Sequence, residues 1–536
     1  MTATALAPAT AKAPSRHLAG TGALLRLALR RDRVMIPVWV AVVAMLVLSM
    51  PGALDSVYGT AAERADLARS MVANTSMRAM YGPVFSDSLG GLVAWRMGVY
   101  AGVLAGVMSL LVVVRHTRDE EESGRQELLS SAMVGRRAPL TAALLAALVA
   151  NAAVAVLIAG GLAAQGGGGA LVLGLSTAGT GMVFATMAAI VAQFTESARL
   201  AKGLTSAVLG LAFALRAAGD SGTADGSSAL TWISPLGWLE NARAFADERW
   251  WVLLLFVAGV GAQAVAAYAL AGRRDLGMSF LPSRPGPAEG TLGTAGALAW
   301  RLQRGTVFGW SAGFLCAGIA FGGMTQGAAD LVGNNARTRD IIERMGGQSG
   351  LTDAFLAAMT GMLGMVAALF IVSSVLRLSG EETSQRAEPV LAAAVGRLRW
   401  AAGHLVIAFG GAALIMLLGG LGLGIGYGGH FGPVLGACLA QLPAIWVIGG
   451  LAVLLFGLFP RGAAAAWAVA GLTLLIGWIG PALELPQPVM NLSPYTHLPK
   501  LPGGDMTWTP VLLLTAVAAA LVAAGLAGLR RRDLSS

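Results

Sequence analysis

Long stretches without charged residues dominate the chain. Windows such as 138–164, 170–194 and 434–459 contain no Asp, Glu, Lys or Arg. About 20 consecutive apolar residues suffice for a helix to cross the hydrocarbon core of a bilayer. The pattern therefore predicts an all-α polytopic membrane protein with about 12 transmembrane helices. The predicted spans are 35–53, 97–114, 138–164, 170–194, 203–219, 251–271, 306–323, 355–376, 400–423, 434–459, 464–481 and 509–529.

The polar segments between the spans repeat. The most charged run, 115–136, has a weaker copy at 379–399, and at an offset of 261 nine of seventeen positions are identical. A Ser-Pro pair precedes the sixth and the twelfth span, and the sequence RRDL follows both. Self-similarity of this kind indicates duplication. We expect two six-helix halves, and six spans per half make the repeat parallel. The predicted parts are 1–276, a linker 277–295, and 296–536.

Composition and charge narrow the class further. Only 12% of the 536 residues are charged and the mean hydropathy is +0.69, where a soluble protein carries about 25% charged residues. The net charge of +9 is spread over loops, which argues against a nucleic-acid partner. Most Arg and Lys fall on one side if the N-terminus is inside, so we expect a plasma-membrane protein with both termini cytoplasmic. The basic, amphipathic segment 21–34 would lie in the inner headgroup layer.

The chain lacks the motifs of known enzyme sites. It contains no HExxH motif, no paired CxxC motif and no phosphate-binding GxxxxGK[ST] loop. We therefore expect no catalytic site, no metal site and no nucleotide-hydrolysing domain. Inside the predicted spans, Arg216 and His404 stand near opposite ends of their helices. Both are expected to snorkel or pair locally, with direct substrate or lipid binding as the alternative. The shortage of buried carboxylates argues against an ion-coupled carrier.

The chain is expected to have two charged cytoplasmic segments but no nucleotide-hydrolysing domain. This combination is typical of a permease driven by a separate ATPase. Residues 119–133 are polar first and then apolar at helical spacing, so they predict a helix lying across the membrane face. Gly135 and Gly396 would end the two helices, and the arginines that follow suit a helix C-terminus. A solvated loop is the plainer interpretation of the acidic run, and its repetition in the second half argues against it.

These residues resemble a known family. The pattern RxTRxEEExGRxELLxxxxVGR at 115–136, with its copy at 381–397, looks like the type-two ABC exporter permeases. More narrowly it is similar to the double-length actinobacterial permeases of the polyketide-antibiotic, tetronasin-resistance kind. The resemblance implies that each segment docks on a separately encoded ATPase, present in two copies. That partner would hold ATP and Mg²⁺, and this chain would hold no cofactor.

The resemblance also implies site residues. The coupling residues would be Arg118, Glu120, Glu121, Arg125, Glu127 and Arg136 in the first half and Glu381, Glu382, Arg386, Glu388 and Arg397 in the second. Gly124 and Leu128 are replaced by Gln385 and Pro389 in the copy, so we expect the two docking contacts to be inequivalent.

The substrate path is implied between the second and fifth spans of both halves. It would be lined by Tyr100, Met108, Leu211, Phe213, Met362, Met365, Trp467 and Trp478, although such side chains also suit plain bundle packing. The outer stretches 54–95 and 325–354 are expected to form short helices over the exit. The predicted function is ATP-driven export of hydrophobic compounds such as antibiotics. The alternative is an ATP-independent secondary carrier, or a membrane sensor or scaffold for such compounds.

Overall fold

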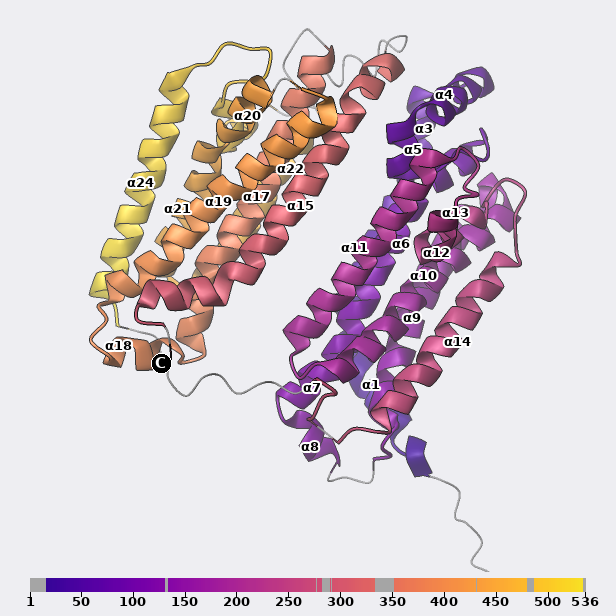
Figure 1. The fold of residues 1–536 in the computed structure, drawn as a ribbon, viewed down its shortest axis with the longest axis horizontal. Helices are drawn as coiled ribbons and strands as arrows, with labels where there is room; N and C mark the ends of the chain where they lie inside the picture. Colours follow the sequence, from indigo (N-terminus) through magenta and orange to yellow (C-terminus); the bar gives the residue numbers. More distant parts are fainter. Residues whose placement is uncertain are drawn as a thin grey trace, which may run out of the picture. The chain divides into compact units, whose positions relative to one another are not determined.

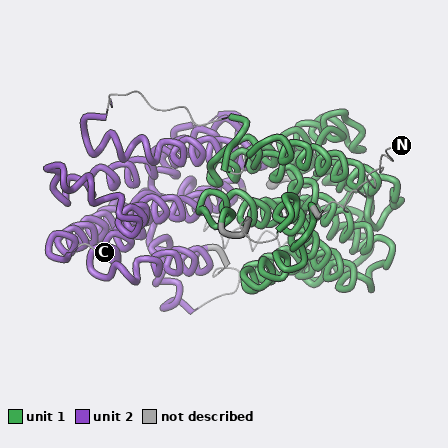
Figure 2. The backbone as a smooth tube through the Cα atoms, turned by 90° about the horizontal axis from the view of Figure 1, so that it is seen from below, with its two compact units in different colours: residues 1–285 green, residues 286–536 purple. Residues whose placement is uncertain are grey.

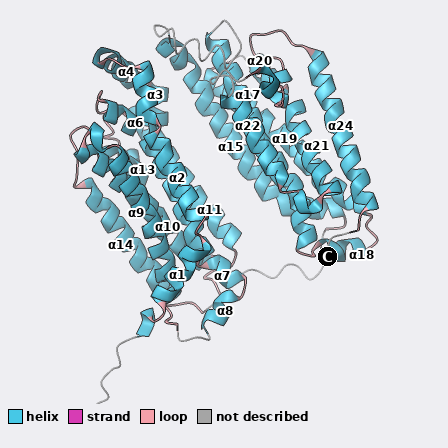
Figure 3. Cartoon of the chain, turned by 180° about the vertical axis from the view of Figure 1, so that it is seen from behind, coloured by secondary structure: helices cyan, strands magenta, loops and turns pink. Residues whose placement is uncertain are grey.

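Helices make up all the regular structure in the described part of the chain (Figure 3). The computed structural model describes residues 16–130, 134–275, 277–281, 290, 292–332, 351–429, 431–479 and 486–533. The chain forms two compact units, Met1–Pro285 and Gly286–Ser536 (Figure 2). The boundary between the units falls in the predicted linker 277–295.

Unit 1 begins with the amphipathic α1 and continues through six apolar spans (Figure 1). Its helices are α1 (Thr21–Arg31), α2 (Met35–Leu48), α3 (Met50–Val57), α4 (Ala61–Ala73), α5 (Thr75–Tyr81), α6 (Leu89–Arg115), α7 (Arg118–Glu122), α8 (Arg125–Ser130), α9 (Ala138–Gly161), α10 (Gly167–Phe194), α11 (Ala198–Gly222), α12 (Ala229–Ile233), α13 (Pro235–Asn241) and α14 (Val252–Ala271). The short helices α7 and α8 lie at the same end of the unit as α1, whereas α3, α4 and α5 lie at the other end.

Unit 2 repeats much of this order. Its helices are α15 (Ala295–Val332), α17 (Leu351–Thr383), α18 (Ala387–Ala392), α19 (Arg397–Tyr427), α20 (Phe431–Leu439), α21 (Leu442–Leu458), α22 (Ala465–Ile479), α23 (Gln487–Met490) and α24 (Trp508–Arg531). Eleven stretches of the described chain are long and apolar enough to cross a membrane. The remaining predicted span, 464–481, corresponds to α22, whose described apolar stretch is shorter. An outer helix was also expected within 325–354, and most of that stretch lies outside the described residues.

Local sequence explains where the helices start and break. The Thr60 hydroxyl accepts from the Glu63 N–H while the Glu63 carboxylate accepts from the Thr60 N–H, a capping box that starts α4. Ser88 caps α6 in the same way with one bond from the Gly91 N–H. The predicted span 434–459 is interrupted between α20 and α21, where Pro443 occupies the first turn of α21. That break was not predicted, because proline and glycine are common inside membrane helices.

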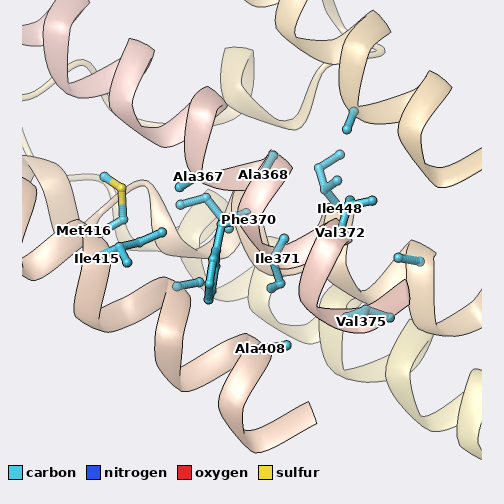
Figure 4. Packing of buried hydrophobic residues seen from close by; sticks show 14 of the residues in the cluster. Ala367, Ala368, Phe370, Ile371, Val372, Val375, Ala408, Ile415, Met416 and Ile448 are labelled. Carbon is cyan, nitrogen blue, oxygen red and sulfur yellow. The ribbon is translucent and has the colours of Figure 1, made fainter. Parts of the chain in front are cut away.

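In unit 2 the core is built around α17. Phe370, Ile371, Val372 and Val375 of this helix are fully buried. Their partners come from α19 and α21, among them Ala408, Ile415, Met416 and Ile448 (Figure 4). In unit 1 the corresponding centre is α10, which packs against α6, α9 and α14. In unit 1 this packed centre lies between α7 and α8 at one end and α3, α4 and α5 at the other.

Glycines let pairs of helices in unit 2 touch backbone to backbone. A Cβ atom at Gly457 on α21 would collide with the Gly525 carbonyl on α24, and one at Gly422 on α19 would collide with the Leu315 carbonyl on α15. Small residues at a helix interface allow such close approach in membranes, where packing replaces the hydrophobic effect.

We expect Gly457→Ala to lower the thermal stability of the purified permease by about 1–3 kcal/mol, because the added methyl group overpacks the α21–α24 interface. Gly410→Ala on α19 is the matched control, since nothing lies within 4 Å of a Cβ there. Melting followed by size-exclusion chromatography in detergent measures both. Equal melting temperatures for the two variants would contradict the close packing.

Candidate functional site

A bidentate ion pair joins the charged segment 115–136 to the chain just after the sixth span, α14. Arg274, just after α14, donates from Nη1 to Glu121 Oε2 at 2.8 Å and from Nη2 to Glu121 Oε1 at 2.6 Å. Both side chains are 9% exposed. Bidentate arginine–carboxylate pairs are strong and fix orientation as well as distance. The pair therefore holds α7 against the C-terminal end of α14.

Arg118 and Arg136 reinforce this pair. The Arg118 side chain is buried, pairs with Glu121, and donates to the backbone carbonyls of Ala192 (3.1 Å) and Met278 (3.0 Å). Arg136 Nη2 donates to the Arg274 carbonyl at 2.8 Å. Arg118 and Arg136 are thus bonded within unit 1, where they tie the segment to α10 and to the chain after α14.

Unit 2 forms the same pair at the corresponding positions. Arg532, after α24, donates to the two oxygens of Glu382 at 2.6 and 2.7 Å, and Arg397 donates to the Arg532 carbonyl at 2.5 Å. Glu382 corresponds to Glu121 and Arg397 to Arg136 at the sequence offset of 261. We call each set the clamp: Glu121, Arg274 and Arg136 in unit 1, and Glu382, Arg532 and Arg397 in unit 2.

The preceding glutamates pair differently in the two units. In unit 1, Glu120 pairs with Arg31 of α1 and with Arg125, whose Nε lies 3.0 Å from Glu120 Oε2. In unit 2, Glu381 lies 2.9 Å from Arg377 of its own helix and 3.6 Å from Arg386. The second segment therefore lacks the contact that joins the first segment to the amphipathic helix.

Four of the predicted coupling residues face outward. The Arg125 and Arg386 side chains are 52% and 59% exposed, and Glu127 and Glu388 are exposed as well. Arg125 and Glu127 lie on α8, Glu388 lies on α18, and Arg386 directly precedes α18. We call these four residues the coupling edge, and the other predicted coupling residues are bonded within their own unit.

The two charged segments keep a similar backbone conformation at the positions where their sequences differ. Gly124 has φ 72° and Gln385, its counterpart, has φ 57°, so both turns use the left-handed region. Glycine adopts this conformation without strain, whereas glutamine does so at a cost. Pro389, opposite Leu128, stands in the first turn of α18, where its missing N–H has no helical partner to lose.

The predicted path residues have varied surroundings. Met108 is fully buried, whereas Leu211 and Trp467 are 58% and 44% exposed. Met365 lines a cavity of about 50 Å³ beside the break between α20 and α21. The remaining members are half-buried or lie outside the described side chains; Tyr100, Phe213 and Met362 are half-buried, and the Trp478 side chain is not described.

Sequence reasoning missed a buried ion triad at the outer end of unit 1. Arg216 on α11 donates to Asp220 at 3.4 Å, to Glu240 on α13 at 3.1 Å and to the Met80 carbonyl at 3.0 Å. Arg216 and Asp220 are fully buried and Glu240 is 9% exposed. The available signal was the Arg216–Asp220 spacing of one helical turn at the end of an apolar helix. Glu240 was hidden in a stretch that its polarity assigned to the exterior.

His404, the other titratable residue of the predicted spans, also pairs locally. Its Nδ1 lies 2.9 Å from Gln303 Nε2, and the Gln303 carbonyl oxygen accepts from Ser374. These three residues join α19, α15 and α17 and are all buried. His404 thus acts as a polar link between helices, in agreement with local pairing.

We expect Arg274→Ala and Arg532→Ala each to destabilise the protein by about 3–5 kcal/mol, because each change removes the bidentate partner of a largely buried carboxylate. The neighbouring arginines of the same RRDL motif, Arg273 and Arg531, are exposed and serve as matched controls. Thermal melting of the four alanine variants tests this. If each clamp variant melted together with its neighbour, the clamp would have no structural role.

Burial raises the pKa of Glu240 well above its ordinary value of 4.5, the negative Asp220 adds to this shift, and Arg216 opposes it. The folded protein therefore keeps a proton that the unfolded chain has lost. Stability should fall as pH rises from 4.5 towards the raised pKa. Glu240→Gln should flatten this dependence, which melting curves at pH 5, 6, 7 and 8 would show. Parallel pH profiles for wild type and variant would exclude the titration.

Comparison with known proteins places the chain among efflux permeases. Residues 292–530 match the family described as the C-terminal domain of the multidrug efflux system permease Rv1217c. The chain is 43% identical over 551 residues to the multidrug efflux system permease protein Rv1217c of Mycobacterium tuberculosis (strain ATCC 25618 / H37Rv), and the match covers 98% of both chains. These matches support the expected drug-efflux permease but not its narrower tetronasin-type class. The chain belongs to the family of the multidrug efflux system permease Rv1217c.

Proposed function

We propose that this protein is the membrane subunit of an ATP-driven exporter of hydrophobic compounds, energised by a separately encoded ATPase. The observation that carries the proposal is the repeated clamp, which fixes a short helix with exposed charges at the same end of each unit's spans. A partner bound to the coupling edge would pull directly on α7–α8 and α18. The relative's printed name, a multidrug efflux system permease, supports drug export.

The clamp would connect movement of the charged segment mechanically to the ends of the spans. In unit 1 it joins the segment between the second and third spans to the end of the sixth, and Arg118 adds a bond to the end of α10. Because a bidentate pair resists rotation, displacement of the segment would move these helix ends together. We place the protein in the plasma membrane with both termini and both coupling edges in the cytoplasm, as the distribution of Arg and Lys favours. ATP and Mg²⁺ would bind to the partner.

We expect Arg125→Glu combined with Arg386→Glu to weaken association with the ATPase by about tenfold or more, because like charges then meet at the interface. The ATPase is the one that co-purifies with the tagged permease from its native membranes. Arg69→Glu is the control, since Arg69 is an exposed arginine on α4, at the opposite end of unit 1 from the coupling edge. The variant should lose some thermal stability, because the new glutamates lie beside Glu120 and Glu381, so association is measured well below its melting temperature.

Two results would count against this proposal. Unchanged association of the double variant would remove the coupling edge from the interface. If no ATPase co-purified and inside-out vesicles took up a lipophilic dye without ATP, the protein would instead be an ATP-independent carrier. Binding of the dye without any uptake would favour a sensor or scaffold.

A further inference from the structure

Arg96 is an arginine at the edge of a membrane span without an acidic partner among the described residues. It lies on α6, roughly 10 Å along the helix from Leu89 at 1.5 Å per residue. Its guanidinium stands 4.5 Å from the centre of the Tyr81 ring and 5.8 Å from that of Trp95. It forms no described hydrogen bond and is half-buried. Arg96 directly precedes the predicted span 97–114, near one end of the longer helix α6, and an unpaired arginine at the edge of a span is a candidate for binding an anion.

A second unsatisfied donor lies in the same cluster. The Tyr100 hydroxyl, one helical turn further along α6, is buried and has no hydrogen-bond partner among the described residues. The Tyr100 and Tyr81 rings meet edge to face at 5.7 Å between centroids. Arg96 and Arg216 are both close enough to interact electrostatically with this hydroxyl. Buried polar groups are nearly always satisfied, so an orphan hydroxyl beside a free cation indicates an absent acceptor.

The neighbouring charges are already engaged. Arg216 binds Asp220 and Glu240. Arg243 pairs with Asp247 at 2.9 Å, and Arg78 donates to the carbonyls of 72, 220 and 221. Arg96 is therefore the cation of this described cluster that remains available to a ligand.

The feature is specific to the first half of the chain. At the offset of 261, Arg96 corresponds to Ala357 and Tyr100 to Gly361, and these two small residues line the cavity beside Met365 in unit 2. If Arg96 were needed for packing of the repeated bundle, a comparably large side chain would be expected in the second half. The difference points to a role in recognition.

We propose that Arg96, Tyr100 and the rings of Tyr81 and Trp95 form a binding site for the anionic group of an amphipathic compound. The guanidinium would pair with a carboxylate or sulfonate, the Tyr100 hydroxyl would donate to it, and the aromatic rings would hold the adjoining apolar part. This site deepens the proposed export function, on which it rests, by assigning hydrophobic organic anions as a substrate class. The phosphate of a lipid headgroup has the same chemistry and is the competing source of the anion.

Two dyes with one aromatic framework test the site. The anion 1-anilinonaphthalene-8-sulfonate and neutral N-phenyl-1-naphthylamine differ by the sulfonate. Their dissociation constants are measured by fluorescence on the full-length permease in phosphatidylcholine nanodiscs, with empty nanodiscs subtracted. Arg96→Gln should weaken binding of the sulfonate dye about tenfold or more, since bonds to charged groups are worth that much. Binding of the neutral dye should change less than twofold, which also shows that the variant is folded.

Two further variants separate charge from packing. Arg96→Lys should stay within about threefold of wild type for the anionic dye, because it keeps the charge. Tyr100→Phe should weaken the anionic dye about threefold, as it removes one neutral donor. Arg69→Gln, at an exposed arginine, should change neither dye. Equal losses for both dyes in Arg96→Gln would overturn the proposal, because they would indicate a packing defect.

Bound lipid is counted separately by native mass spectrometry. Loss of one retained phospholipid in Arg96→Gln, with unchanged affinity for the sulfonate dye, would assign the site to lipid and overturn its role in substrate binding. Because both measurements use the permease without its partner, their failure leaves ATP coupling untouched. Failure of the ATPase to associate would equally leave the anion site standing.

Discussion

One interaction fixes the position of the charged segment in each unit. It is the bidentate bond between the second arginine of RRDL and a glutamate of the segment, Arg274 with Glu121 in unit 1 and Arg532 with Glu382 in unit 2. In unit 1, Arg118 and Glu120 add contacts to α10 and α1, whereas in unit 2 the described ion pairs of Glu381 stay within its own segment and helix. A six-residue helix in water has almost no stability of its own. The clamp converts such helices into rigid extensions of the spans. The charged residues therefore have two roles, because the clamp fixes the position of the helices that carry the coupling edge.

The two units share this clamp and differ in most other polar features. Unit 1 adds the contact from Arg31 to Glu120, the triad around Arg216 and the free cation Arg96. Unit 2 has the polar link through His404 and a small cavity lined by polar residues such as Gln441 and Thr496 as well as by Met365. The two units thus share the clamp but differ in their buried polar groups. Under the proposed function, both halves would respond to the same motion of the ATPase while contacting different parts of an asymmetric substrate.

Hydrophobic patterning predicted the helical architecture well, because an apolar segment of this length has few other ways to satisfy its backbone. The helices α4 and α5 were also foreseen, since capping at Thr60 and Asn74 is local. The charge pattern identified the two charged segments, but it did not predict which of their side chains face the rest of the unit. Whether Glu121 faces a partner or Arg274 depends on contacts across 153 residues. The triad escaped prediction for the same reason, because Glu240 is buried by tertiary packing in a stretch of polar composition.

The measurement that tests the central claim most directly is ATP-driven transport by proteoliposomes containing the permease, its ATPase and a reversed clamp. Glu382→Arg and Arg532→Glu are made singly and together in unit 2. The account predicts that each single variant loses most transport and that the double variant recovers about half or more, because the pair is restored with opposite polarity. Single variants that transported at the wild-type rate would contradict it, and the clamp would then have no part in transmitting the motion of the ATPase.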